Sequence, residues 1–240
     1  MLRYISIYIS AFLISFSSLA SAQQNALPKR IQVNYAVTKN GLPFAKVREQ
    51  FVITGNTYQV ESVTKGIGIY ALFGERQLTS QGNVNRLGLK PRRFELQQGR
   101  DEKHSLIADF DWPNKMLHMT VKGTVKEEAL TSGVQDLASY PYQFMFLPKP
   151  LKNKFLLKMT TGKKLNLYEY KISNSKEVLK IAGTQYNTLH LAQVANQTSS
   201  KLDSKDLWLS VDRYYLPVRL VIVDDNGQKL EQTLTELHAE

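Results

Sequence analysis

Hydrophobic and polar residues alternate along most of the chain with a period of two. In the first clear case, Ile31, Val33, Tyr35 and Val37 are separated by polar or small residues. This alternation is typical of a β-strand with one face in the core and the other in solvent. Strand-like patterns recur at 44–53, 57–64, 77–85, 90–98, 105–111, 116–125, 155–160, 165–172, 178–182, 188–194, 207–211, 216–223 and 229–237.

The connections between these segments are mostly short turns. Asn40-Gly41 and Asp225-Asn226-Gly227 are strong hairpin signals. Short strands joined by tight turns are typical of antiparallel architecture. The sequence therefore predicts a mainly β fold, either an antiparallel β-barrel or a strongly curved sheet. No linker or fixed-period repeat divides the sequence, so we expect a single domain over residues 23–240.

One stretch, residues 131–150, departs from the strand pattern. Three- and four-residue steps favour a short helix over about residues 133–147, started by Ser132 or Asp136 and stopped by Pro148. Pro141 would fall at a first turn or a kink. We expect this central helix to pack against the sheet. If the stretch is extended instead, alternation gives it one aromatic face, made of Tyr140, Tyr142, Phe144 and Phe146.

The first 22 residues have the pattern of a secretory signal peptide. Arg3 precedes an apolar, serine-rich run, and small residues end at Ala22. We expect cleavage near Ala22-Gln23 and a mature protein in a bacterial periplasm. The run is too short for a confident membrane anchor, so we do not expect an integral membrane protein. The chain has no cysteine, which excludes disulfides, thiol nucleophiles and thiolate metal sites.

The positive net charge of the chain predicts anionic partners. Removing the signal lowers the formal net charge from +10 to +9, because Arg3 is its one charged residue. Such an excess favours a lipid surface or an anionic envelope polymer. Nucleic acid is not an expected partner, because the chain carries an export signal and no nucleic-acid-binding motif.

The strongest enzyme-like cluster is His104 with Asp109 and Asp111. The two carboxylates point to the same side of a strand, where they could share a proton or a cation. They are candidate catalytic residues of a periplasmic hydrolase or glycan-modifying enzyme. The same pattern arises where carboxylates cap the turn at Pro113-Asn114, and we favour that interpretation.

Other chemistry has no support in the sequence. The four histidines (His104, His118, His190 and His238) lack metal-ligand spacing. The sequence contains no phosphate-binding loop, dinucleotide fingerprint or nucleophile elbow. We therefore expect neither a metal nor a cofactor.

Four aromatic residues are candidates for ligand binding: Tyr140, Tyr142, Phe144 and Trp208. They could line an apolar cavity beside the central helix. Aromatic side chains more often simply fill a core.

Four segments, taken together, resemble the exported bacterial family called domain of unknown function 3108. In chain order they are residues 88–95 (GLKPRRFE), 108–112 (ADFDW), 132–139 (SGVQDLAS) and 207–227 (LWLSVDRYYLPVRLVIVDDNG). The family name assigns no activity. The last segment also resembles the closing strands of periplasmic lipoprotein carriers, which are half-open barrels plugged by helices. That likeness implies an apolar cavity for acyl chains.

These observations favour a non-enzymatic periplasmic protein. It would bind an apolar or amphiphilic envelope component such as a lipid, or dock an envelope protein. The first alternative is an enzyme using Asp109 and Asp111. The second is a purely structural interaction protein with a filled barrel.

Overall fold

The computed structural model describes residues 27–99, 105–194, 204–224 and 226–240. The first half of this fold comprises strands β1 (Arg30–Lys39), β2 (Leu42–Thr54), β3 (Thr57–Gly66), β4 (Arg76–Asn85), β5 (Gly88–Gln98), β6 (Leu106–Asp111), β7 (Met116–Val121) and β8 (Thr124–Ala129). The second half comprises β9 (Gln135–Asp136), β10 (Lys154–Thr160), β11 (Leu165–Ile181), β12 (Thr184–Gln193), β13 (Ser204–Ser210), β14 (Leu216–Val223) and β15 (Lys229–Ala239). The helical pieces are η1 (Gly68–Phe73), α1 (Tyr140–Gln143) and η3 (Phe144–Phe146).

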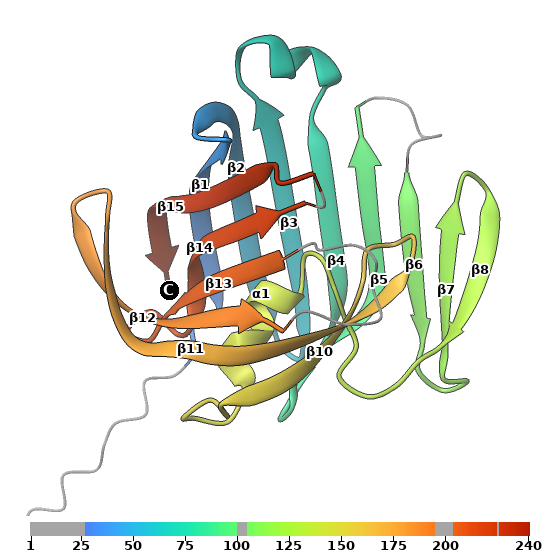
Figure 1. Ribbon diagram of the computed structural model, residues 1–240. Helices are drawn as coiled ribbons and strands as arrows, with labels where there is room; N and C mark the ends of the chain where they lie inside the picture. The colour runs from blue at the N-terminus through green and yellow to red at the C-terminus, as the bar shows by residue number, and fades with distance from the viewer. Residues whose placement is uncertain (1–26, 100–104, 195–203, 225) are drawn as a thin grey trace, which may run out of the picture.

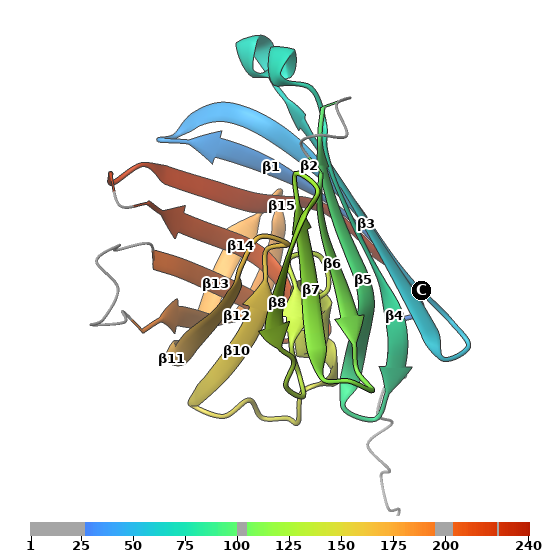
Figure 2. The same ribbon diagram turned by 90° about the vertical axis from the view of Figure 1, so that its right-hand side faces the viewer.

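Within the described residues, all the strands belong to one fifteen-stranded sheet, in the order β8-β7-β6-β5-β4-β3-β2-β1-β15-β14-β13-β12-β11-β10-β9. Neighbours pair antiparallel, apart from the short parallel pair β9 and β10. The sheet curls so that β3–β5 and β11–β14 form two walls that face each other (Figures 1 and 2). It does not close, because β8 and β9 are its two edges.

The predicted fold class is therefore confirmed as a strongly curved antiparallel sheet with one short helix. The helix lies inside the curve, between the two walls (Figure 1). No helix in the described part of the chain has the length and apolar character needed to cross a bilayer.

The helical segment is shorter than the sequence pattern predicts. It covers residues 140–146 instead of about 133–147. Gln135 and Asp136 are extended, because they pair with Met159 and Thr160 of β10. Pro141 then sits in the first turn of α1, where its missing N–H costs nothing.

Two strand boundaries also differ from the pattern. The segment 116–125 is not one strand: it turns at Lys122-Gly123, where both residues have positive φ, and returns as β8. The segments 165–172 and 178–182 are one long strand, β11, whose register slips between Ile172 and Glu177. The sequence pattern does not reveal that the two segments form one strand, because the bulge between them shifts the alternation of apolar and polar residues out of phase.

The core fills the space between the walls and the helical segment. Tyr142 of α1 stacks on Phe51 of β2, with ring centroids 4.7 Å apart and planes 9° apart. On the other side of the segment, Phe144 meets Phe155 of β10 edge-on at 5.9 Å. The helical segment thus contacts the curved sheet on two sides, at β2 and at β10. Aromatic pairs of this kind add about 1 kcal/mol each to their area burial.

Two glutamines attach this segment to the start of β5. Gln135 Nε2 donates to the carbonyl oxygen of Leu89 at 3.0 Å. Gln143 accepts from the Leu89 N–H at 2.8 Å and donates to the Leu87 carbonyl at 2.9 Å. Gly88 lies between these contacts with φ +108°, and an added Cβ would meet the Gln143 side chain. The β4–β5 corner is therefore shaped around the helical segment.

A second close approach joins β4 to β5 at Gly82. The β4–β5 register shifts between Gln81 and Gly82. A Cβ on Gly82 would lie 2.2 Å from the Lys90 carbonyl oxygen and 2.8 Å from the Pro91 Cα. Both of these are backbone atoms, which cannot rotate away.

We predict that Gly82→Ala lowers the free energy of unfolding by about 1–3 kcal/mol, because β5 must move to relieve the clash. Urea unfolding followed by circular dichroism measures this change. Gln81→Ala, on the exposed face of the same strand, should change stability by less than about 0.5 kcal/mol. Equal effects of the two substitutions would contradict the close approach.

Candidate functional site

A cavity of about 320 Å³ lies on the concave side of the sheet, beside α1. Leu137, Tyr140 and Pro141 form its wall on the helical side. The strands contribute mostly apolar side chains, namely Tyr35, Val37, Phe44, Ala45, Val47, Leu78, Met159, Tyr170, Leu207, Leu220, Ile222 and Leu230. Small-molecule sites typically have this size and this apolar lining.

Strand alternation decides which side chains reach the cavity. On β2, Ala45, Val47 and Glu49 face inward and the residues between them face outward. On β4, Arg76 and Leu78 face inward in the same way. Both charged residues therefore occupy positions that the alternation assigns to the core.

Glu49 places a carboxyl group within the cavity wall. It accepts a hydrogen bond from the Tyr142 hydroxyl at 3.0 Å and another from the Ser62 hydroxyl at 3.1 Å. Burial raises the pKa of Glu49, while these two hydrogen bonds oppose the rise. Glu49 therefore takes up a proton more readily than an exposed glutamate does.

Three cationic residues also line the cavity, namely Arg76 of β4, Lys205 of β13 and Arg219 of β14. Lys205 Nζ donates to the Tyr168 hydroxyl at 3.0 Å and lies 4.3 Å from the centre of the Tyr168 ring. Its charge is thus compensated by an oxygen and a π face. Arg76 is half-buried at the end of β4 that adjoins η1.

The buried carboxyl of Asp136 anchors the segment that leads into α1. Its Oδ1 accepts from the backbone N–H groups of Ala138 and Ser139, at 2.9 and 2.8 Å. Its Oδ2 accepts from the Ser80 hydroxyl of β4 at 2.6 Å, and Tyr58 continues this chain. Asp136 therefore caps a turn before the helix and ties that turn to the sheet.

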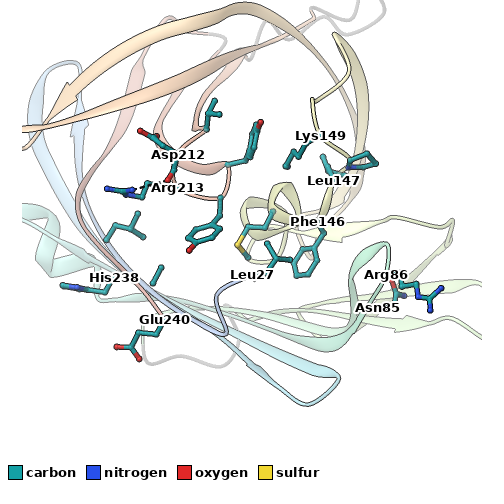
Figure 3. Close-up of a pocket in the computed structure, with 17 residues that line it drawn as sticks. Leu27, Asn85, Arg86, Phe146, Leu147, Lys149, Asp212, Arg213, His238 and Glu240 are labelled. Atoms are coloured by element: carbon teal, nitrogen blue, oxygen red, sulfur yellow. Dashed lines mark hydrogen bonds between the residues drawn. The ribbon is translucent and has the colours of Figure 1, made fainter. Parts of the chain in front are cut away.

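A wider hollow of about 1510 Å³ lies on the other side of the helical segment, between the β4–β5 turn, the β13–β14 turn and the end of β15 (Figure 3). Lys149 lies over the Tyr215 ring, 3.7 Å from its centre, and donates to the Phe144 carbonyl. Burial lowers the pKa of Lys149 to about 8. Charged side chains such as Asp212 and Arg213 border this hollow, which distinguishes it from the apolar cavity.

The structure gives Asp109 and Asp111 local partners on the outer face of β6. Asp109 Oδ1 accepts from Arg93 at 2.8 Å. Asp111 accepts from the Asn114 side chain and backbone, which lowers its pKa. Neither residue lines the two hollows described above. His104, the third member of the predicted cluster, lies outside the described residues.

The four aromatic candidates have different positions. Tyr140 lines the cavity, and Tyr142 reaches it through its hydrogen bond to Glu49. Phe144 is buried in the core and lines neither hollow. Trp208 lies on the opposite face of β13 from the cavity residue Leu207 and lines neither of the two hollows.

Trp208 is buried and belongs to a cluster of stacked side chains. His190 stacks on its ring at 4.1 Å, and the Arg219 guanidinium lies 4.6 Å from the ring centre. His190 also contacts the Ser173 hydroxyl at 2.7 Å and Asp206 at 3.1 Å. Ser173 is exposed at the bulge of β11, and neither of the two hollows includes it. We interpret this series of side-chain contacts as a structural link between β11, β12 and β13.

Sequence reasoning missed Glu49, Arg76 and Lys205 as cavity residues. The signal that could have found the first two is a charged residue in the inward phase of a strand, as Glu49 is between Val47 and Phe51. Among the described residues, no cluster of three or more histidine, aspartate or glutamate side chains could hold a metal ion.

Comparison with known proteins places the chain in a family. The profile described as "Protein of unknown function (DUF3108)" matches residues 31–235. This chain belongs to the DUF3108 family. No curated protein matches the sequence. Among solved structures, the chain is similar to a DUF1329 family protein from Desulfovibrio piger ATCC 29098, with 8% identity over 89% of this chain and 86% of that chain. The TM-score of 0.23 is too low to establish a common fold.

The DUF3108 match covers the sheet and the helical segment alike, so the cavity is built from family residues on both walls. The resemblance noted at 88–95 and 132–139 corresponds to segments in mutual contact, through Gln135 and Leu89. The family description assigns no activity, so the chemistry of the cavity is argued from its individual side chains.

We predict that Asp136 makes stability depend on pH. Burial raises its pKa from 3.8 to about 6, so the folded chain holds the proton more tightly than the unfolded chain does. The contribution is fully present below about pH 4 and is lost as pH rises through about 6, a change of about 3 kcal/mol at most. Urea unfolding of wild type and Asp136→Asn between pH 4 and pH 7 measures the difference.

Asp136→Asn is the informative variant, because an amide can accept from Ala138 and Ser139 and donate to Ser80. Its stability should lack the Asp136 component of the pH dependence, and the wild type should lose stability relative to it as pH rises. Parallel pH profiles for the two proteins would show that Asp136 does not titrate in this range. Asp136→Ala, which leaves the N–H groups unpaired, should be destabilised throughout.

Proposed function

We propose that this DUF3108 protein binds an apolar or amphiphilic component of the bacterial envelope in the cavity beside α1. The observation that carries the proposal is a 320 Å³ space lined mainly by apolar side chains, beside two clusters of buried core residues. Interiors are close-packed, and an empty apolar space lowers stability. A ligand that fills it regains the lost contacts.

The lining suits a ligand with an apolar body and a polar end. Met159, Leu207 and Leu220 offer hydrocarbon surface to the body. The few polar groups, such as Glu49 and Arg76, can fix its orientation. A lipid or another single-chain amphiphile has this combination of parts.

We further propose that the protein works in the periplasm. The support is the signal-peptide pattern of residues 1–22, which lie outside the described part of the structure. The net positive charge of the mature chain would favour contact with anionic lipid surfaces there.

The alternative based on Asp109 and Asp111 has less support. Their partners, Arg93 and Asn114, give both carboxylates local structural roles on an outer face. The alternative of a filled interior is also less favoured, because the cavity is present beside Tyr140.

Ile222→Trp is the variant that tests the cavity. Ile222 lines it from β14, and an indole there would occupy the space. We predict that wild type binds cis-parinaric acid, a fluorescent fatty acid, with saturable fluorescence enhancement, and that Ile222→Trp lowers the affinity at least about 10-fold. Native mass spectrometry of the protein from a periplasmic extract should also detect a bound amphiphile.

Val223→Trp is the matched control, since the neighbouring residue lies on the other face of β14 and lines neither hollow. It should bind the probe like the wild type, and circular dichroism should show that both variants fold. A wild-type protein that purifies empty and takes up no fatty acid or phospholipid would refute the proposal.

A further inference from the structure

Arg76 occupies a position where a charged side chain is unusual. It is the first residue of β4, and it pairs across the sheet with Thr64 of β3. Both residues line the cavity, at its end nearest η1. Leu78, two residues further along β4, continues the same wall with an apolar side chain. The guanidinium group thus lies at one end of the apolar cavity, where strand β4 begins.

Arg76 has no partner for its charge among the residues that the structure describes. Its side chain forms neither a hydrogen bond nor an ion pair with any of them, whereas Arg93 is paired with Asp109, and Arg219 with Glu231. Of the other two cations that line the cavity, Lys205 donates to the Tyr168 hydroxyl, and Arg219 is the one paired with Glu231. Arg76 is the exception among the inward-facing charges.

Glu49 does not balance this charge. Its two oxygens accept hydrogen bonds from Tyr142 and Ser62, and it forms no ion pair with Arg76. Burial also lowers the pKa of Arg76, which means that its surroundings disfavour the charge. A guanidinium group nevertheless keeps its proton in proteins. The ligand-free cavity therefore holds a partly desolvated guanidinium group that forms no ion pair with a described residue.

An unpaired charge removed from water destabilises a protein, unless a binding partner supplies the opposite charge. We infer that Arg76 binds the anionic head group of the amphiphile, a carboxylate or a phosphate, while the apolar tail extends along the cavity toward Tyr140 and Met159. This inference rests on the proposed function. The Thr64 hydroxyl lies beside Arg76 and can donate a further hydrogen bond to the same head group.

The chemistry of arginine suits this task. Its planar fork of N–H donors matches the two oxygens of a carboxylate or phosphate, and it forms two parallel hydrogen bonds with them. Such bonds are stronger in a partly dehydrated cavity than at an exposed surface. A neutral lipid with the same tail would leave Arg76 unpaired and would bind more weakly.

The test compares ligands that share one alkyl tail and differ in their head group. Palmitate, hexadecyl phosphate and the neutral hexadecanol are used to displace cis-parinaric acid from the full mature chain, for wild type and for Arg76→Gln. Wild type should prefer at least one anionic ligand over hexadecanol by about 10- to 100-fold, the range expected for charge-assisted hydrogen bonds. Arg76→Gln should lose this preference while its affinity for hexadecanol is unchanged. Palmitate and hexadecyl phosphate together show which oxyanion is recognised.

Arg48→Gln is the matched control, because it removes the same charge from an exposed position on the outer face of β2. It should keep the wild-type preference. If wild type binds all three ligands equally, or if Arg76→Gln weakens all three equally, the inference is overturned while the proposed function stands. If wild type binds none of them, the proposed function fails.

A second measurement needs no ligand. Arg76→Met keeps an unbranched side chain of similar length and removes the unpaired charge. If Arg76 is uncompensated in the empty protein, Arg76→Met should shift the urea midpoint of the delipidated protein upward, and Arg48→Met should not. A downward shift for Arg76→Met would mean that the guanidinium group is already satisfied within the protein, and would overturn the inference.

Discussion

The buried carboxyl of Asp136 is the contact on which the arrangement of the interior depends. It accepts hydrogen bonds from two backbone N–H groups of its own segment and from the hydroxyl of Ser80, in the middle of strand β4. α1 begins four residues later, so this carboxyl determines where the helical segment enters the concave face. The segment then separates the cavity from the wider hollow and brings Tyr142 to Glu49. The shape of the cavity follows from a hydrogen-bonded turn more than from the helix itself.

The buried acids and the inward-facing arginine differ in whether a change of protonation can neutralise them. Asp136 and Glu49 are both hydrogen-bonded by hydroxyl or amide groups, and burial raises the pKa of each. An acid in this situation can become neutral by taking up a proton. Arg76 cannot become neutral by losing one at any physiological pH. The charge of Arg76 is therefore permanent, and its guanidinium group forms no ion pair with a residue that the structure describes.

The sequence predicts the sheet well and the site poorly, for one physical reason. A period of two identifies which residues face inward, as at Val33 and Val47, but it does not distinguish a residue that touches a neighbour from one that faces a void. Val33 and Val47 both belong to the core cluster, but of the two only Val47 also lines the cavity, although their sequence settings are alike. The helix boundaries were wrong because Gln135 and Asp136 gain more from pairing with β10 than from a helical turn.

The residues that give the family resemblance and the residues that set the chemistry of the cavity lie in different places. The segments 88–95 and 132–139 contact each other and hold the helical segment on the sheet. Glu49 and Arg76 lie outside all four resembling segments. A chain can therefore retain the sheet, the plug and the cavity while the charges inside the cavity change. In this chain, the residues that hold the helical segment on the sheet are therefore distinct from Glu49 and Arg76, which place charged groups in the cavity.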